Sequence, residues 1–404
     1  MSNTKSKKAS PWIVFIAIIL GVIIGSLTPQ TSFVWEIYNV GGRLFINALL
    51  LLVVPLVASS IITGVAKIAG DPAFGRLGLK TFGAFLGTNL LAILTGALFV
   101  NLLNPGAHFH AQIITDTSAI QQMAAQNTLS ISHLLLQIIP SNIIDAFSKG
   151  QMLGIIFFSI LFGYCISKIS KASADSLNQF AQGVFETMLQ FTHLIMKTLP
   201  LGVFLLVAKV FSEFGLQSLQ SLGLFTLTVL LGFIFFMFVV LPILLKFIAG
   251  KSPIAHIKAM TPALITAFST SSSAATLPVT MECVEKRAGV SNKISSLVIP
   301  LGTSMNLTGS ALYMCVASLF VAQAYGIDLT LTTQALIVLL AFMLTLGVAG
   351  VPSSSLVAII AILHAIGIPA EGIGLFIAVD RVLDMCRTTV SVFTGSCCAV
   401  LVDS

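Results

Sequence analysis

The stretch that decides the fold is Asp380-Arg-Val-Leu-Asp-Met-Cys-Arg-Thr-Thr-Val-Ser391, a charged segment between two apolar runs near the C-terminus. On a helix of about 3.6 residues per turn, Asp380, Asp384, Arg387 and Ser391 fall within about 60° of one another. Each charge at mid-bilayer costs about 2.5–3.5 kcal/mol unless it meets protein, water or a ligand. Asp384 could simply pair with Arg387, but that pairing alone gives Asp380 and Ser391 no role. We therefore interpret this face as a substrate site inside a membrane protein.

The composition excludes an ordinary soluble protein. Mean hydropathy is +1.03, with 56% hydrophobic and only 8% charged residues. The net charge of +6 comes largely from Lys and Arg between apolar segments, so it reports topology, and no nucleic-acid partner is expected. The six cysteines have no spacing typical of a metal site, and we expect free thiols.

Apolar segments of about 20 residues, long enough to cross a bilayer, recur through the first part of the chain. We predict spans at 12–27, 44–68, 81–103, 154–169, 185–211 and 222–248. Lys and Arg precede the first span and follow the second, fourth and sixth, whereas the 104–128 loop has neither. The positive-inside rule therefore places the N-terminus in the cytoplasm and this loop outside.

The pattern changes after Gly250, where apolar stretches are interrupted by Gly, Pro and Ser. Such interruptions in matching positions are typical of a transporter site at the bilayer midplane. We predict two re-entrant hairpins at 253–288 and 332–366, followed by full helices at 291–325 and 370–404. Ordinary spans kinked by Pro and Gly are the alternative. The predicted fold is an all-α polytopic membrane protein with eight transmembrane helices plus two re-entrant helical hairpins and both termini cytoplasmic.

Two polar stretches in this half could bind ligands. The hydroxyls of Ser271–Ser273 and the amides of a following helix suit an anionic group, although a simple polar turn fits equally well. Asn306 and Ser310 supply oxygens for a cation or a substrate. The Ser, His and Asp residues have no strand–turn–helix setting for hydrolysis, so we do not expect an enzyme.

The sequence resembles the dicarboxylate/amino acid:cation symporter family, which includes the glutamate transporters, and within it the proton–glutamate symport proteins. The resemblance runs through essentially the whole chain. It is carried, in order, by Ile138-Ile-Pro-Ser-Asn142 with Gly150-Gln151, Ser271-Ser-Ser-Ala-Ala-Thr-Leu-Pro-Val-Thr280, Asn306-Leu-Thr-Gly-Ser-Ala-Leu-Tyr313, Ala349-Gly-Val-Pro352 and Asp380-Arg-Val-Leu-Asp-Met-Cys-Arg-Thr388.

The resemblance implies a homotrimer with an elevator mechanism, in which a scaffold holds a mobile transport domain. The scaffold would comprise 1–80, with spans one and two, and 128–217, with spans four and five. The transport domain would comprise 81–127, with span three and the external loop, and 218–404, with span six, both hairpins and spans seven and eight.

The resemblance also implies a substrate site formed by both hairpins and the two last helices. Its members by position are Ser272, Ser273, Ser310, Val351, Ser355, Asp384, Arg387, Thr388 and Ser391. Asp384 would bind the amino group of the substrate and Arg387 its side-chain carboxylate. Ser391 stands where the family has asparagine, which shortens that contact.

The implied coupling residues are Asp380, Asn306, Thr308 and Ser304, and Asn306 and Ser304 are weak candidates for a sodium site. The chain departs from the family here. Thr308 replaces a sodium-binding carboxylate, Leu307 replaces a methionine, and the later sodium-binding aspartate falls on Gly395 or Ser396. Moving Na⁺ out of water needs oxygen ligands, usually with a compensating negative charge.

We therefore expect a symporter of acidic amino acids, glutamate or aspartate, coupled to H⁺ rather than Na⁺ and without a cofactor. Asp380 is the expected proton carrier because it lies one turn farther from Arg387 than Asp384 does. The alternative is that Asp380 only orients its neighbours. A four-carbon dicarboxylate is the alternative substrate, and a non-transporting receptor or anion leak is the alternative class. The expected location is the plasma membrane, a bacterial inner membrane, with the lipid bilayer as surroundings.

Overall fold

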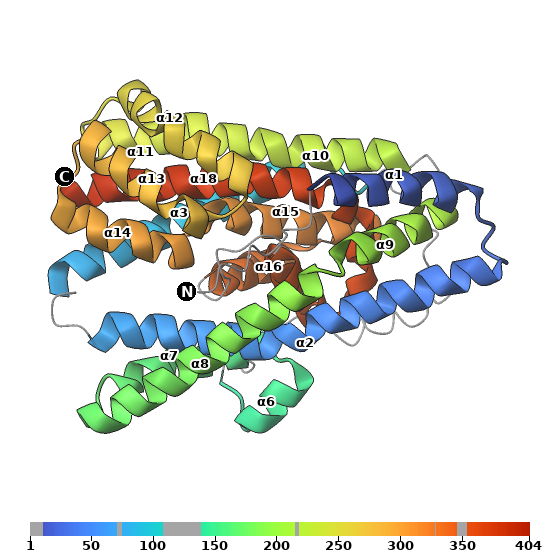
Figure 1. The fold of residues 1–404 in the computed structure, drawn as a ribbon, viewed down its shortest axis with the longest axis horizontal. Coiled ribbons are helices and arrows are strands. Elements are labelled where there is room, and N and C mark those ends of the chain that lie inside the picture. The colour runs from blue at the N-terminus through green and yellow to red at the C-terminus, as the bar shows by residue number, and fades with distance from the viewer. Residues whose placement is uncertain (1–10, 71–74, 108–138, 215–217, 328, 346–353) are drawn as a thin grey trace, which may run out of the picture.

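The computed structural model describes residues 11–70, 75–107, 139–214, 218–327, 329–345 and 354–404 (Figure 1). Every regular element in these ranges is a helix. The all-helical class predicted from the sequence is therefore confirmed for the described part of the chain.

The first half of the chain contributes long helices close to most of the predicted spans, together with a few short ones. They are α1 (Pro11–Leu27), α2 (Phe33–Gly70), α3 (Gly75–Leu103), α6 (Ile143–Lys149), α7 (Met152–Ile166), α8 (Lys171–Met196), α9 (Leu199–Phe214), α10 (Ser218–Phe235), the π-turn η3 (Phe236–Val240) and α11 (Leu241–Phe247). The predicted span at 185–211 is not one continuous helix. The helix breaks after Met196, and Pro200, which has no N–H to donate, lies in the first turn of α9, where that loss is tolerated.

The second half consists of shorter helices that meet at the polar interruptions. They are α12 (Pro253–Thr270), α13 (Ser273–Glu282), η4 (Cys283–Arg287), α14 (Asn292–Met305), α15 (Thr308–Ala324), α16 (Leu331–Leu344), α17 (Ser354–Ala365), the 3₁₀ turn η5 (Ala370–Leu375) and α18 (Ile377–Asp403). Between α12 and α13, Ser271 adopts a left-handed conformation with φ of 50°. Ser272 then caps α13 by accepting a hydrogen bond from Ala275 N at 3.3 Å.

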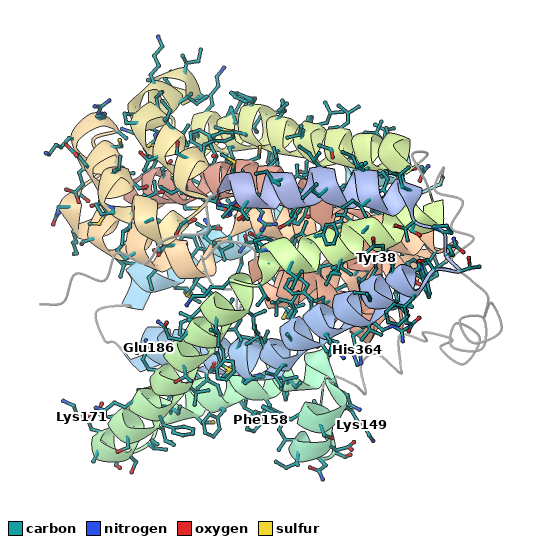
Figure 2. The ribbon with its side chains drawn as sticks, turned by 45° about the vertical axis from the view of Figure 1, so that its right-hand side comes forward. Tyr38, Lys149, Phe158, Lys171, Glu186 and His364 are labelled. Carbon is teal, nitrogen blue, oxygen red and sulfur yellow. The ribbon has the colours of Figure 1, made fainter. Side chains whose placement is uncertain are left out.

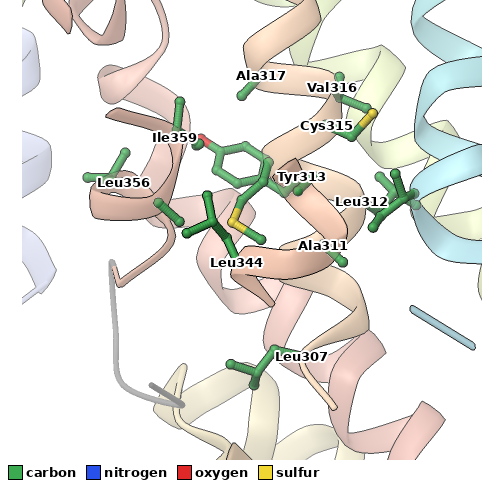
Figure 3. Packing of buried hydrophobic residues seen from close by; sticks show 14 of the residues in the cluster. Leu307, Ala311, Leu312, Tyr313, Cys315, Val316, Ala317, Leu344, Leu356 and Ile359 are labelled. Atoms are coloured by element: carbon green, nitrogen blue, oxygen red, sulfur yellow. The ribbon is translucent and has the colours of Figure 1, made fainter. Parts of the chain in front are cut away.

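The centre of the molecule is formed by α18 and α15. In Figure 1, α18 runs between α10 and α12 on one side and α3 and α15 on the other, and it packs against all four. Every residue of α15 except Gln323 is buried. Figure 3 shows Tyr313 of α15 directed toward Leu356 and Ile359 of α17, with Leu344 beside it. The polar site is thus enclosed by helices on all sides.

The periphery is formed by α2, α7, α8 and α9, with α6 at one end (Figure 1). Large apolar side chains of this region are exposed, among them Phe180, Phe191, Leu194 and Leu201. Figure 2 shows Lys171 and Glu186 along the projecting helix α8, and Lys149 at the end of α6. Exposed apolar side chains on such long helices suit contact with lipid or with another membrane chain.

Five helical stretches among the described residues are long and apolar enough to cross a membrane. They are Phe33–Ala66, Leu77–Leu103, Ser221–Phe247, Asn292–Ala324 and Ile377–Asp403. Shorter apolar helices accompany them, including Gly154–Ile166, Leu331–Leu344 and Ser355–Ala365. A polytopic membrane protein follows from these lengths and compositions. The count of eight spans and the re-entrant paths stay predictions.

Candidate functional site

The charged face of α18 is fully enclosed in the protein. Asp380, Asp384 and Arg387 are 3%, 2% and 1% exposed, and Arg387 is among the largest fully buried side chains. Arg387 Nε donates to Asp384 Oδ1 at 2.8 Å, and Nη1 donates to Asp380 Oδ1 at 3.1 Å. The guanidinium therefore bridges two carboxylates one helical turn apart, as the spacing of the sequence predicts.

This geometry corrects two steps of the sequence argument. Asp384 does pair with Arg387, and that pairing does not leave Asp380 unused, because Arg387 contacts both acids. Asp380 lies one turn farther along the helix from Arg387 than Asp384 does, yet it also contacts Arg387, at 3.1 Å. Arg381 adds a second cation, with Nη1 3.4 Å from Asp384 Oδ2. Two acids and two bases thus compensate one another, which lowers the cost of burying each charge.

The guanidinium retains unused hydrogen-bonding capacity. Nη2 lies 2.7 Å from Asp384 Oδ1 but makes no aligned hydrogen bond with any described residue. Guanidinium groups bind carboxylates through two parallel N–H donors. A carboxylate ligand could therefore bind Nη2 without displacing both internal partners of Arg387.

Tyr313 of α15 is a member of the site that the sequence analysis missed. Its hydroxyl donates to Asp380 Oδ1 at 2.9 Å, and the Cζ atom of Arg387 lies 4.8 Å from the centroid of its ring. An aromatic face attracts a guanidinium, so Tyr313 holds both charges. Its spacing of three residues from Ser310 was the available signal, because it places both on one face of α15.

α15 and α18 approach closely at Gly309. A Cβ atom at this position would overlap the carbonyl oxygen of Arg387. Gly309 N donates to Ser391 Oγ at 3.0 Å, so this hydroxyl joins the two helices. Thr388 also uses its hydroxyl within the protein, donating to Asp384 O at 2.8 Å. The glycine therefore lets the α15 backbone reach the charged face.

The remaining sequence-predicted substrate residues lie at helix starts around α18. Ser272 and Ser273 begin α13, which packs against α18; Ser310 is in the first turn of α15, and Ser355 is in the first turn of α17. Ser273, Ser310 and Ser355 are buried. The hydroxyls of Ser271 and Ser355 are buried and have no hydrogen-bond partner among the described residues. Val351 lies outside the described residues.

The region around Asn306 was the predicted cation site. Asn306 Oδ1 accepts from Thr88 Oγ1 at 3.4 Å, and Asn306 Nδ2 donates to Cys398 Sγ at 3.5 Å. The buried hydroxyl of Thr308 has no partner among the described residues. The side chain of Ser304 lies outside the described part of the structure.

The described side chains around Asn306 supply no negative charge for a sodium ion. The groups that hydrogen-bond to Asn306 are a hydroxyl and a thiol, and a thiol is a poor ligand for a hard cation. The two buried carboxylates of α18 already pair with Arg387. A bound sodium charge would therefore lack compensation here.

Comparisons with known proteins give the family. The model of the sodium:dicarboxylate symporter family matches residues 11–404. The chain is 37% identical to a proton/glutamate-aspartate symporter of Escherichia coli (strain K12), over all of this chain and 93% of that protein. It is 37% identical to a proton/sodium-glutamate symport protein of Geobacillus stearothermophilus, over 96% of this chain and 93% of the relative.

A second kind of relative is also similar. The chain is 32% identical to a C4-dicarboxylate transport protein of Bacillus subtilis (strain 168), over 96% of this chain and 91% of the relative. All of these relatives are named as transporters, which confirms the expectation of a transporter rather than an enzyme. The chain belongs to the sodium:dicarboxylate symporter family.

Proposed function

We propose that this chain is a secondary active symporter that takes up acidic amino acids, glutamate or aspartate, together with a cation. The observation that carries the proposal is the buried juxtaposition of Asp384 and Arg387, whose Nη2 atom has no aligned hydrogen bond. An acidic amino acid offers an ammonium group for Asp384 and a side-chain carboxylate for Arg387. Its second carboxylate suits the serine hydroxyls and the α13 N-terminus. Both 37% relatives are named for glutamate.

A four-carbon dicarboxylate is the alternative substrate. A relative at 32% identity is named for it, so the family includes such transporters. A dicarboxylate has no ammonium group to approach Asp384. It would instead bring a carboxylate toward the Asp384 carboxylate, and like charges repel. Asp384 therefore favours the amino acid. A non-transporting receptor or an anion leak is the alternative of another class.

We infer that the coupling ion is H⁺ rather than Na⁺. The hydroxyl and thiol groups around Asn306 do not compensate a sodium charge. Asp380 remains the proposed proton carrier. The reason is now its set of hydrogen-bond partners and no longer its distance from Arg387. It has one contact with Arg387, at 3.1 Å, and its other partner is the Tyr313 hydroxyl. A hydroxyl can donate to a carboxylate or accept from a carboxylic acid, so it can serve both protonation states.

The proposed assembly follows the family resemblance. It is a homotrimer in a bacterial inner membrane, with both termini cytoplasmic, a scaffold of 1–80 and 128–217, and a transport domain of 81–127 and 218–404 that moves as an elevator. The division is supported by the packing of α3, α10, α12, α14 and α15 on α18.

Competition of radiolabelled glutamate uptake tests the substrate. Purified protein in liposomes should accumulate glutamate, and unlabelled aspartate should compete strongly, whereas succinate and serine should compete weakly. Strong competition by succinate with none by aspartate would assign the dicarboxylate instead. Absence of accumulation under every imposed gradient would support the receptor or leak.

Separate ion gradients test the coupling. An inward proton gradient at equal sodium should drive accumulation, and an inward sodium gradient at equal pH should not. Asp380→Asn should abolish proton-driven accumulation while glutamate exchange continues, because exchange needs the site but no net proton movement. Accumulation driven by sodium alone at equal pH would refute proton coupling.

A further inference from the structure

His256 is a buried titratable residue outside the charged site. It lies in the first turn of α12 and is 5% exposed. Its Nε2 atom is 2.9 Å from the hydroxyl oxygen of Ser396 on α18, and its ring centroid lies 5.6 Å from that of Phe393. The imidazole therefore contacts two side chains of α18, both C-terminal to Asp384 on that helix.

The hydrogen-bond directions fix which nitrogen carries the hydrogen. Ser396 Oγ donates its single hydrogen to Phe393 O at 2.7 Å. With its hydrogen on Phe393 O, the Ser396 oxygen accepts from His256, and Nε2 is then the N–H of the neutral ring. An added proton would go to Nδ1 and give the ring a positive charge.

The surroundings of the imidazole oppose that charge. Burial disfavours it, and so does the positive end of the α12 dipole. The ionisable side chains near this end of α12 and on the elements packed against it are Lys258 on α12, Glu282 on α13, Cys283, Glu285, Lys286 and Arg287 on η4, Lys246 on α11, and Cys397, Cys398 and Asp403 on α18. The other ionisable residues of α18 are those of the charged site and its neighbour Cys386, namely Asp380, Arg381, Asp384, Cys386 and Arg387; they lie toward the other end of α18, Asp384 being ~18 Å along the helix from Ser396.

The acids among these groups are engaged elsewhere. Glu282 pairs with Lys286 at 3.2 Å, Glu285 accepts from Asn292 and Ser295, and Asp403 accepts from Ser291 at 2.9 Å. Among the described residues, Ser396 is the hydrogen-bond partner of the imidazole. The arrangement therefore suits a neutral histidine.

The contact also sets the position of the serine turn. From His256 to Ser271 α12 rises by ~22 Å, and from Ser396 back to Asp384 α18 spans ~18 Å, at about 1.5 Å per residue. α12 and α13 both pack against α18. Because these two lengths are similar, the contact between His256 and Ser396 at one end of α12 places the Ser271–Ser273 turn, at its other end, near the part of α18 that carries the charged face.

We propose that His256 is a positioning residue that, as a neutral imidazole, fastens α12 to α18 through Ser396 and so holds the serine turn beside Asp384 and Arg387. The fastening is separate from proton coupling, which is assigned to Asp380. Its effect on substrate affinity rests on the proposed function, whereas its effect on stability does not.

The test compares full-length variants in detergent and in liposomes. His256→Leu and Ser396→Ala remove the contact, and His256→Gln keeps an N–H donor without a titratable ring. His364→Gln is the matched control, because His364 is exposed at the end of α17 (Figure 2). Glutamate affinity and Tm without substrate are each measured from about pH 7.5 to about pH 5.5, where an unperturbed histidine titrates.

We expect His256→Leu and Ser396→Ala each to weaken glutamate binding by about two- to tenfold, the usual range for one hydrogen bond. The double variant should be no worse than either single one. His256→Gln should bind within about twofold of wild type and should lose part of the fall in Tm that wild type shows at acid pH, because the unfolded chain protonates this histidine and the folded chain keeps it neutral. His364→Gln should follow wild type.

Two results would overturn the proposal. One is wild-type affinity and Tm in both Ser396→Ala and His256→Leu, and the other is a wild-type pH profile in His256→Gln. If His256→Leu fails to fold, Ser396→Ala and His256→Gln still decide. If wild type binds no acidic amino acid, the proposed function fails, and the Tm series alone decides the role of His256.

Discussion

The two helical segments that carry the charged site and the more apolar segment α10–α11 beside them distribute polarity in opposite ways. Within Asn292–Ala324, all residues of the most apolar 18-residue stretch are buried, and the polar residues Asn306, Thr308 and Ser310 of this segment are buried too. In Ile377–Asp403 the corresponding share is 78%. In Ser221–Phe247, which is more apolar than either of these segments, the corresponding share is 33%. In a membrane the apolar surface faces lipid and the polar groups need protein partners. Burial of the less apolar helices therefore locates the site.

Two ion pairs make the same contrast at the level of single contacts. Arg387 and Asp384 approach to 2.7 Å with both side chains almost fully buried. Lys149 and Asp145 on α6 approach to 2.9 Å with their side chains 63% and 46% exposed. The distances are similar, but the cost of losing one partner depends on whether water can replace it.

The largest expected effect is that of Arg387→Ala. The change leaves Asp380 and Asp384 buried without the guanidinium that compensates both, and breaking such a pair costs about 3–5 kcal/mol. Tm in detergent should fall sharply, and glutamate binding should be lost. The deficit in Tm should shrink as pH is lowered, because protonated carboxyl groups need no counter-ion.

Arg381→Ala is the matched control for that prediction. Arg381 belongs to the same helix and reaches Asp384 at 3.4 Å, but its side chain is 20% exposed. Its loss should lower Tm much less than the loss of Arg387. Equal losses in the two variants would contradict the view that burial sets the cost.

An intermediate effect is expected at the contact of α15 with α18. Gly309→Ala places a methyl group against the carbonyl of Arg387, so the helices must separate, at a cost of about 1–3 kcal/mol. In Gly395→Ala, on α18, the added methyl meets no heavy atom within 4 Å. That variant should be neutral or gain up to about 1 kcal/mol of helix propensity. Tm and glutamate affinity should fall in the first variant alone.

The sequence predicts the charged site well because helical spacing alone places Asp380, Asp384 and Arg387 on one face. The break at 271–272 is equally readable, since a run of serines interrupts an apolar segment there. Contacts between distant segments are not readable in this way. Tyr313 on Asp380, His256 on Ser396 and Gly309 on Arg387 depend on how helices pack, and a single chain pattern does not encode their register.

The helix break before Pro200 shows how a single proline can be overlooked within a long apolar run. The apolar run at 185–211 is continuous enough to predict one span, and only the proline marks the boundary between α8 and α9. Proline is compatible with the first turn of a helix and incompatible with its interior. Reading the proline before the hydropathy would have divided the segment correctly.

The smallest expected effect is that of Lys149→Ala, which tests the exposed side of the comparison. Lys149 is at the end of α6 (Figure 2) and pairs with Asp145 one turn earlier on the same helix. Exposed pairs of this spacing contribute about 0.3–0.5 kcal/mol, because water solvates each partner when the other is lost. Tm should therefore change by little, and the change should vanish at high salt, which screens exposed charges. Asp145→Asn is the complementary variant and should give the same small shift, since it removes the other partner of one contact. A loss comparable to that of Arg387→Ala would mean that α6 is covered in the assembled protein, and the contrast between buried and exposed pairs would then have to be redrawn with α6 on the buried side.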